Sequence, residues 1–181
     1  KFFLKKELVR VPFLGLAWWC LDFPFLERSG VASKDRETTL KACEKFKALP
    51  VTVMNFVEGT RFTTAKHDAQ GSPFANLLKP KAGGMAIVLS AMGPQIESVL
   101  DVTIAYPGGA PTMWDFLKGQ TPEIRVRVEA IPADRENWGI GGTDKEIRRQ
   151  VTSRLNSLWE EKDGRLGSLL APGVQAQAEK G

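Results

Sequence analysis

Residues 56–63, which read Phe-Val-Glu-Gly-Thr-Arg-Phe-Thr, are the stretch whose residue types and order best suit chemistry. The apolar residues 51–57 predict a β-strand, which gives way abruptly to Glu58, Gly59, Thr60 and Arg61. Such a switch places charged groups on the turn at the end of a strand, where α/β sheets usually bind their ligands. We therefore expect a ligand site at this turn.

Basic residues lie at the ends of three apolar segments. Lys5 closes the first segment, Arg28 follows the second and Arg61 follows the third. If the sheet is parallel, these side chains meet at its carboxyl edge. The guanidinium group of arginine can bind a phosphate through two parallel N–H groups, and the ammonium group of lysine adds a compact positive charge. Lys81 opens a predicted helix, whose free backbone amides add to an anion site. Any one of these residues alone is an ordinary surface charge, but their shared position favours a phosphate site.

The other residues of the turn also need a role. Glu58 would repel a phosphate unless its carboxylate is tied to backbone amides or to a cation. We therefore expect Glu58 to brace the turn or a neighbouring arginine, and not to act as an acid or base. Gly59 permits a tight turn, and Thr60 offers a hydroxyl hydrogen bond.

Other catalytic groups are scarce. His67 is the only histidine, and we expect an exposed loop residue there and not a general base paired with Asp68. No histidine, cysteine or carboxylate cluster has zinc spacing, no serine lies in a Gly-x-Ser-x-Gly setting, and no Walker or Gly-x-Gly-x-x-Gly sequence is present. The sequence therefore predicts no metal site and no cofactor.

Strands alternate with helices along the chain. The patterns predict strands at 2–5, 23–26, 51–57, 99–106 and 123–131, and helices at 7–21, 35–49 and 81–92. Residues 63–79 are expected to form a loop, and residues 112–117 one or two helical turns. Thr143 and Glu146 form a capping box that opens a last helix, whose buried stripe is Ile147, Val151, Leu155, Leu158 and Trp159. This alternation predicts an α/β fold with a largely parallel central sheet flanked by helices. In the strand 123–131, the face with Arg125, Arg127 and Glu129 is expected to be exposed to solvent.

Composition indicates one globular domain. Hydrophobic residues make up 43% of the chain and charged residues 25%, and the net charge of +4 favours anionic ligands or an anionic lipid surface. We expect the domain to cover residues 1–170, with a disordered tail at 171–181. The longest apolar stretch, 11–26, is too short to span a membrane and contains Asp22 and two prolines. Because the chain starts without methionine, we expect a fragment, with any membrane anchor upstream of Lys1.

Several sequence blocks together resemble the PlsC-like family of 1-acylglycerol-3-phosphate and lysophospholipid acyltransferases. Residues 56–61 look like its third block and residues 23–28 like its second, whose last arginine, here Arg28, is implicated in glycerol-phosphate binding. Residues 2–8 resemble the preceding segment, in which the lysine matching Lys5 lines the same site. Residues 102–107 resemble the fourth block. Residues 81–83, Lys-Ala-Gly, are similar to the Lys-x-Gly sequence with which a helix begins in the family. The resemblance implies a glycerolipid acyltransferase-like fold and an acyltransferase enzyme.

The longer string from Glu58 to His67 resembles a subgroup that includes lysocardiolipin and lysophosphatidylinositol acyltransferases. The chain departs from the family pattern in one respect: the catalytic His-x4-Asp block of the family is absent from it. In the family it precedes the segment that residues 2–8 resemble, so we expect it upstream of Lys1. His67 cannot replace it, since His67 lies on the other side of the arginine block. The chain alone is therefore expected to be inactive, with no catalytic residue of its own.

The resemblance implies transfer of a fatty acyl group from acyl-CoA or acyl carrier protein to the hydroxyl of a lysophospholipid such as 1-acylglycerol-3-phosphate. The expected substrate-binding residues are Lys5, Arg28, Glu58, Gly59, Thr60, Arg61 and Lys81. The expected partners are the lysophospholipid, acyl-CoA and a membrane surface, at the cytoplasmic face. A non-catalytic phospholipid-binding module is the alternative.

Nucleic-acid binding is not expected, because the aromatic residues lie in apolar runs and are not interleaved with basic ones. Two interpretations of the aromatic stretch around Trp18 and Trp19 stay open, namely a place at a bilayer interface and packing in the core.

Overall fold

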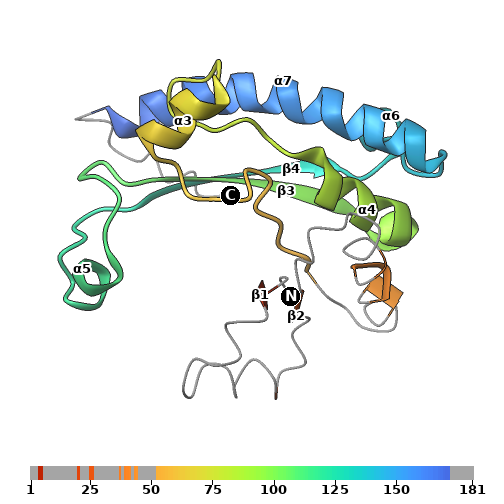
Figure 1. The fold of residues 1–181 in the computed structure, drawn as a ribbon, viewed down its shortest axis with the longest axis horizontal. Coiled ribbons are helices and arrows are strands. Elements are labelled where there is room, and N and C mark those ends of the chain that lie inside the picture. The colour runs from red at the N-terminus through yellow and green to blue at the C-terminus, as the bar shows by residue number, and fades with distance from the viewer. Residues whose placement is uncertain are drawn as a thin grey trace, which may run out of the picture.

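The computed structural model describes residues 4–5, 20, 25–26, 37, 39–41, 43–44 and 52–171 of the chain (Figure 1). Its helices and strands are, in chain order, β1 (Leu4–Lys5), β2 (Phe25–Leu26), α3 (Thr64–Gln70), α4 (Ala82–Met92), the 3₁₀ turn η2 (Gly93–Gln95), β3 (Ser98–Ala105), α5 (Met113–Leu117), β4 (Arg125–Pro132), α6 (Arg135–Trp138) and α7 (Asp144–Leu170). The described residues at 37, 39–41 and 43–44 are also helical, within the helix predicted at 35–49. Apart from Cys20, the helix predicted at 7–21 lies outside the described residues, as does the tail at 172–181.

The main described sheet is antiparallel, so the prediction of a largely parallel sheet is not met in the described part of the chain. β3 and β4 pair along their whole length, from Ser98 with Pro132 to Ala105 with Arg125. Parallel pairing occurs in β1 and β2, which are two residues long each. Residues 106–124, which include α5, join the end of β3 to the start of β4, and these two ends pair with each other as Ala105 with Arg125. The chain therefore turns back as a hairpin.

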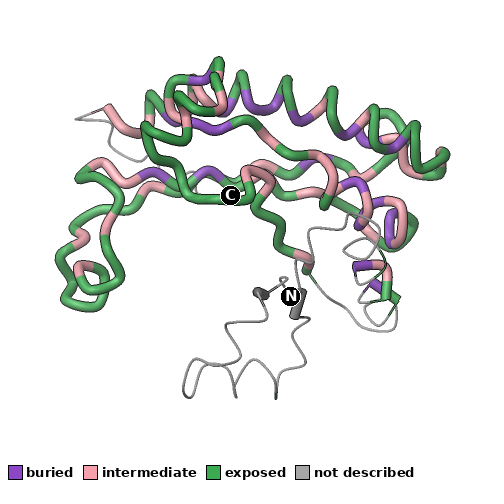
Figure 2. Tube along the Cα trace, viewed as in Figure 1, coloured by how far each residue is buried: buried purple, intermediate pink, exposed green. Residues whose placement is uncertain are grey.

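Helix α7 covers one face of this hairpin and also packs on α4 (Figure 1). The predicted capping box is present, since the Thr143 hydroxyl accepts from the Glu146 amide and the Glu146 carboxylate accepts from the Thr143 amide. The predicted stripe is buried, and it extends by about two more turns to Lys162 and Leu166. Burial of this stripe against α4 and the sheet forms the main hydrophobic core (Figure 2).

The sheet face that meets α7 carries charged residues. Lys162 Nζ lies 2.5 Å from Asp101 Oδ1 and 2.9 Å from the Val102 carbonyl, and it sits 5.1 Å from the Trp159 ring centroid. One turn further along α7, Arg165 forms an ion pair with Glu129. A buried ion-pair network thus joins α7 to both strands.

The prediction that Arg125, Arg127 and Glu129 form a solvent-exposed face of β4 is wrong for Arg125 and Glu129. Arg125 is turned inward and donates to the Leu169 and Ala171 carbonyls at 2.6 and 2.8 Å, which caps the end of α7. Glu129 is half-buried in the ion-pair network, while Arg127 is exposed. The opposite face is the exposed one, and it carries Leu100, Val102, Ile104, Val126 and Val128.

Two other local predictions are also corrected. The predicted strand 51–57 is reduced in the described residues to one bridge residue, Met54, and the side chains of Met54 and Phe56 are exposed. The predicted loop 63–79 contains α3, which begins after Thr63 as N-cap and ends at Gly71 in a left-handed conformation. No residue of α3 is buried, so the helix lacks the apolar stripe by which a sequence reveals one.

Replacing Asp101 by alanine is expected to destabilise the fold severely. The Asp101 and Lys162 side chains are only 9% and 10% exposed, and loss of one partner leaves a buried charge without its counter-ion. We expect the free energy of unfolding in urea to fall by about 3 kcal/mol or more. Glu37→Ala, which breaks the exposed Glu37–Lys41 pair, serves as the matched control and is expected to change stability little. Similar losses from the two variants would contradict the assigned role of the network.

Candidate phosphate-binding site

The predicted glycine turn is present at residues 56–59. The Gly59 amide donates to the Phe56 carbonyl at 2.9 Å, and Gly59 has a φ of +71°. This left-handed conformation is costly for residues with a β-carbon, so glycine is the residue that fits here. The turn exposes Thr60 and Arg61 to solvent.

The start of α4 is fixed against this turn. The Lys81 amide donates to the Val57 carbonyl at 2.7 Å, and Lys81 is the N-cap of α4. A β-carbon at Gly59 would lie 3.8 Å from both Cδ and Nζ of Lys81, so the lysine side chain passes directly over the glycine. The structure therefore brings Gly59 and Lys81 together at the start of α4.

A second lysine, Lys66, reaches the turn from α3. Its Nζ donates to the Thr60 hydroxyl at 2.8 Å and to the Arg61 carbonyl at 3.2 Å. Lys66 is not among the predicted binding residues. The sequence contains one indication of this role, because Lys66 lies near the end of the motif that begins at Glu58.

Arg61 projects from the same turn, and its side chain is exposed. Within the part of the chain that the structure describes, its guanidinium makes no hydrogen bond or ion pair. Arg61 is thus held through its backbone, by Lys66, while its side chain stays available to a ligand.

Glu58 interacts with Trp159 and Lys162 of α7 and with the loop that precedes α4. Its carboxylate accepts from the Leu78 amide at 3.4 Å, so it braces the loop that leads into α4. Burial raises the pKa of Glu58, and the hydrogen bond from Leu78 and the charge of Lys162 oppose that rise. The half-buried acid therefore does not neutralise a cation of the turn, and the contact is of the bracing kind expected.

Two predicted residues cannot be placed beside the turn. Lys5 ends β1 and pairs with Leu26 of β2, so the carboxyl ends of these two parallel strands share an edge. Arg28 follows Leu26 by two residues and lies outside the described residues, as do Trp18 and Trp19. The convergence of Lys5 and Arg28 with Arg61 therefore stays a prediction.

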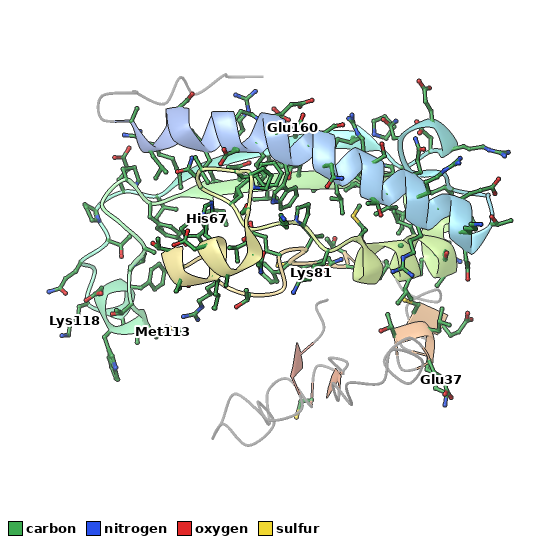
Figure 3. All side chains as sticks on the ribbon, turned by 45° about the horizontal axis from the view of Figure 1, so that its top comes forward. Glu37, His67, Lys81, Met113, Lys118 and Glu160 are labelled. Atoms are coloured by element: carbon green, nitrogen blue, oxygen red, sulfur yellow. The ribbon has the colours of Figure 1, made fainter. Side chains whose placement is uncertain are left out.

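His67 has a structural role that differs from the loop residue we expected. It lies on α3 (Figure 3), where Nδ1 is 3.0 Å from Asp68 Oδ1 and Nε2 is 2.7 Å from the Phe74 carbonyl oxygen. Both partners are acceptors, so the ring satisfies both only when both nitrogens carry protons. The hydrogen bond to Asp68, followed by the one to Phe74, raises the pKa of His67. A histidine held as a double donor is poorly suited to accept a proton as a general base.

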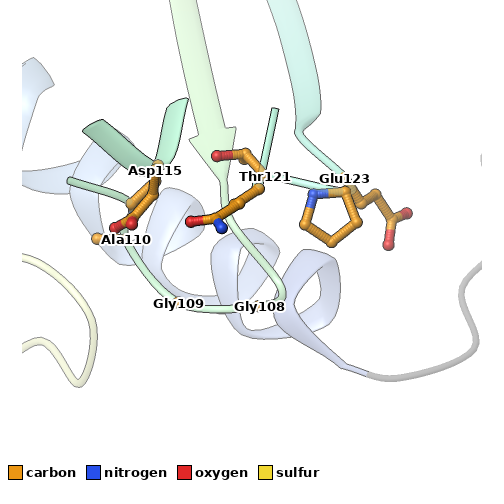
Figure 4. Close-up of a pocket in the computed structure, with 9 residues that line it drawn as sticks. Gly108, Gly109, Ala110, Asp115, Thr121 and Glu123 are labelled. Atoms are coloured by element: carbon orange, nitrogen blue, oxygen red, sulfur yellow. The ribbon is translucent and has the colours of Figure 1, made fainter. Parts of the chain in front are cut away.

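A hollow elsewhere in the described residues is less suited to a phosphate. A small hollow under α5 is lined by Gly108, Gly109, Asp115, Thr121 and Glu123, among others, and by no lysine or arginine (Figure 4). Its two carboxylates would repel a phosphate. Within the described ranges, no group of three or more histidine, cysteine and acidic side chains could hold a metal ion, and no helix has the length and apolarity to cross a membrane.

Comparison with known proteins assigns the chain to a family. Residues 1–107 match the family model described as Acyltransferase, so the chain belongs to the acyltransferase family. It is 27% identical over 179 residues to 1-acyl-sn-glycerol-3-phosphate acyltransferase gamma of Homo sapiens, which covers 90% of this chain and 44% of the relative. It is 27% identical to the delta protein of Mus musculus, with 90% and 43% coverage. It is 30% identical over 138 residues to 1-acyl-sn-glycerol-3-phosphate acyltransferase 2 of Brassica napus, with 70% and 35% coverage.

The chain thus spans less than half the length of these relatives. No solved structure matches it significantly. The PlsC-like resemblance is confirmed at the level of the family, and the lysocardiolipin-type subgroup stays a prediction.

The two hydrogen bonds of the His67 ring predict a pKa above the ordinary 6.5. Since the folded-state pKa exceeds the unfolded one, the interaction stabilises the fold fully below about pH 6.5 and is lost as the pH rises through the folded pKa. Because His67 is the only histidine, an NMR titration of its ring protons in this chain reports the value directly. Asp68→Asn should lower the pKa, whereas the remote Asp115→Asn should not. A pKa at or below 6.5 in the folded chain would contradict the geometry.

Proposed function

We propose that this chain forms the lipid-phosphate-binding part of a lysophospholipid acyltransferase. The reaction transfers a fatty acyl group from acyl-CoA or acyl carrier protein to the hydroxyl of a lysophospholipid such as 1-acylglycerol-3-phosphate. The observation that carries the proposal is the set of three cations at one turn, with Arg61 on the turn itself and Lys66 and Lys81 reaching it from α3 and α4.

This arrangement suits a phosphate monoester. Arg61 offers two parallel N–H groups, Lys81 stands over Gly59 where no β-carbon blocks the approach, and Lys66 adds a further charge held by Thr60. The first turn of α4 adds free backbone amides beside Lys81, at the positive end of the helix dipole. Glu58 contributes as a brace, and Thr60 keeps its hydroxyl proton for the ligand because it accepts from Lys66.

The chemical step needs more than binding. The acceptor oxygen attacks the thioester carbonyl, an ester bond forms, the C–S bond breaks, and the proton of the hydroxyl leaves with the departing thiol. A general base must take that proton first, and the family resemblance assigns it to a His-x4-Asp block that residues 1–181 do not contain. We propose that this chain binds and orients the acceptor and does not turn over alone. Lys5 and Arg28 are proposed to complete the phosphate site.

Arg61→Ala in the complete gene product that contains this chain should lower kcat/KM for lysophosphatidate about 10- to 100-fold, because a hydrogen bond to a charged group contributes about 1.5–3 kcal/mol. The loss should appear mainly in the KM of the acceptor and not in that of acyl-CoA. Lys66→Ala should show a smaller loss. Arg148→Ala, at an exposed arginine of α7, is the matched control and should leave the kinetics unchanged.

A phosphate-free acceptor separates the role of Arg61 from a general loss of structure. With a monoacylglycerol of the same chain length, wild type and Arg61→Ala should react equally poorly. An unchanged kcat/KM for lysophosphatidate in Arg61→Ala would show that the site is wrongly assigned. Tight lysophosphatidate binding by a wild-type product that transfers no acyl group would favour the non-catalytic binding module.

A further inference from the structure

Helix α5, at the end of the β3–β4 hairpin, exposes all of its large apolar side chains. Met113, Trp114, Phe116 and Leu117 are 69%, 70%, 55% and 64% exposed. Figure 1 shows α5 at the far end of the hairpin, away from α7, and Figure 3 shows Met113 and Lys118 there. The family model ends at residue 107, so this feature lies beyond the part of the chain that the model accounts for. We call Met113, Trp114, Phe116 and Leu117 the apolar knob.

The knob is ordered by its own backbone and not by packing. The Thr112 hydroxyl accepts from the Asp115 amide, and the Asp115 carboxylate accepts from the Thr112 amide and hydroxyl at 2.9 and 2.6 Å. At the other end, the amides of Lys118, Gly119 and Gln120 donate to the carbonyls of residues 114, 116 and 115. Most backbone amides of the turn therefore have partners within the turn, which lowers the cost of moving it into a region with less water.

The arrangement of the side chains makes α5 amphipathic. At about 100° per residue, the four apolar side chains cover an arc of roughly 160°, and Asp115 lies opposite them. Between residues 106 and 122, the only charged residues are Asp115 and Lys118, of opposite sign. The Asp115 carboxylate is bound to Thr112 in the N-terminal cap of α5. Lys118 lies at the edge of the apolar arc, where its long aliphatic side chain allows the ammonium group to reach lipid headgroups.

The apolar surface also continues from the knob onto the strands. Ile124 precedes β4 on the connection from α5, and Ile104 pairs with Val126 at the adjoining end of the sheet. All three side chains are exposed, at 41%, 47% and 55%. Exposed apolar side chains are thus present both on α5 and at the end of the sheet from which it projects.

We propose that α5 docks this protein on a lipid bilayer, with the apolar knob in the interfacial region and Lys118 at the level of the headgroups. A wide apolar arc with a tryptophan, a low charge and a self-contained backbone suits the interface of a bilayer. The proposal rests on the proposed function for its choice of occupant, since the acceptor lipid resides in such a bilayer. Docking by α5 would hold the binding turn at a fixed place relative to the membrane that supplies its substrate.

The test measures binding of the 181-residue chain to phosphatidylcholine vesicles that contain lysophosphatidate. The double variant Trp114→Ala and Phe116→Ala should weaken co-sedimentation at least about tenfold, because burial of two aromatic side chains is lost. Leu100→Ala is the matched control, since Leu100 is 53% exposed at the opposite end of β3, and it should bind as the wild type does. Brominated phosphatidylcholine should quench tryptophan fluorescence in the wild type and markedly less in Trp114→Phe.

Equal vesicle binding by wild type and double variant, with unchanged thermal melting, would overturn the proposal. A concentration-dependent dimer that the double variant abolishes, with vesicle binding unaffected, would also overturn it in favour of a second copy of this chain. Assays of the complete gene product separate this proposal from the proposed function. The double variant should lose activity on vesicle-bound acceptor and keep it on a short-chain lysophosphatidate in solution, whereas failure of the proposed function would remove transfer to both in the wild type.

Discussion

The ion-pair network between α7 and the β3–β4 hairpin decides how this fold is arranged. Lys162 and Arg165 meet Asp101 and Glu129 across the interface, and each needs its partner because a lone buried charge is costly. The charged face of the hairpin is therefore turned inward, and Arg125 reinforces this by capping the end of α7. The apolar face is consequently left outside and continues towards α5. One electrostatic constraint thus fixes which face of the hairpin is buried and which face is exposed.

The same helix positions the candidate site from a distance. Asp163 of α7 accepts from the amides of residues 75 and 76 at 2.8 and 2.7 Å, which holds the loop between α3 and α4. Leu78 of that loop donates to Glu58, and Lys81 fixes the turn to α4, which in turn packs on α7. The cations at the turn are therefore displayed by a chain of contacts that begins at α7, while the side chain of Arg61 stays available to a ligand.

Sequence patterns predict the elements best where one physical effect dominates. The last helix is predicted together with its cap and buried stripe, because apolar spacing and the Thr143–Glu146 box agree. The turn at Gly59 is predicted because glycine tolerates its φ, and the place of Lys81 follows from the start of α4. The faces of β4 are misread, because alternation shows that two faces differ but not which one is buried. Partners distant in sequence, Lys162 with Asp101 and Arg165 with Glu129, determine that choice. Lys66 is missed because α3 has no buried stripe that would reveal it as a helix.

The central claim is that the turn at Glu58–Arg61 binds the phosphate of a lysophospholipid. A crystal structure of the complete gene product with lysophosphatidate bound tests it most directly. The account predicts that the phosphate oxygens accept hydrogen bonds from the Arg61 guanidinium and from at least one of the Lys66 and Lys81 ammonium groups, with Glu58 still turned towards Leu78. A phosphate bound elsewhere, with the Arg61 side chain making no contact to the lipid, would contradict it.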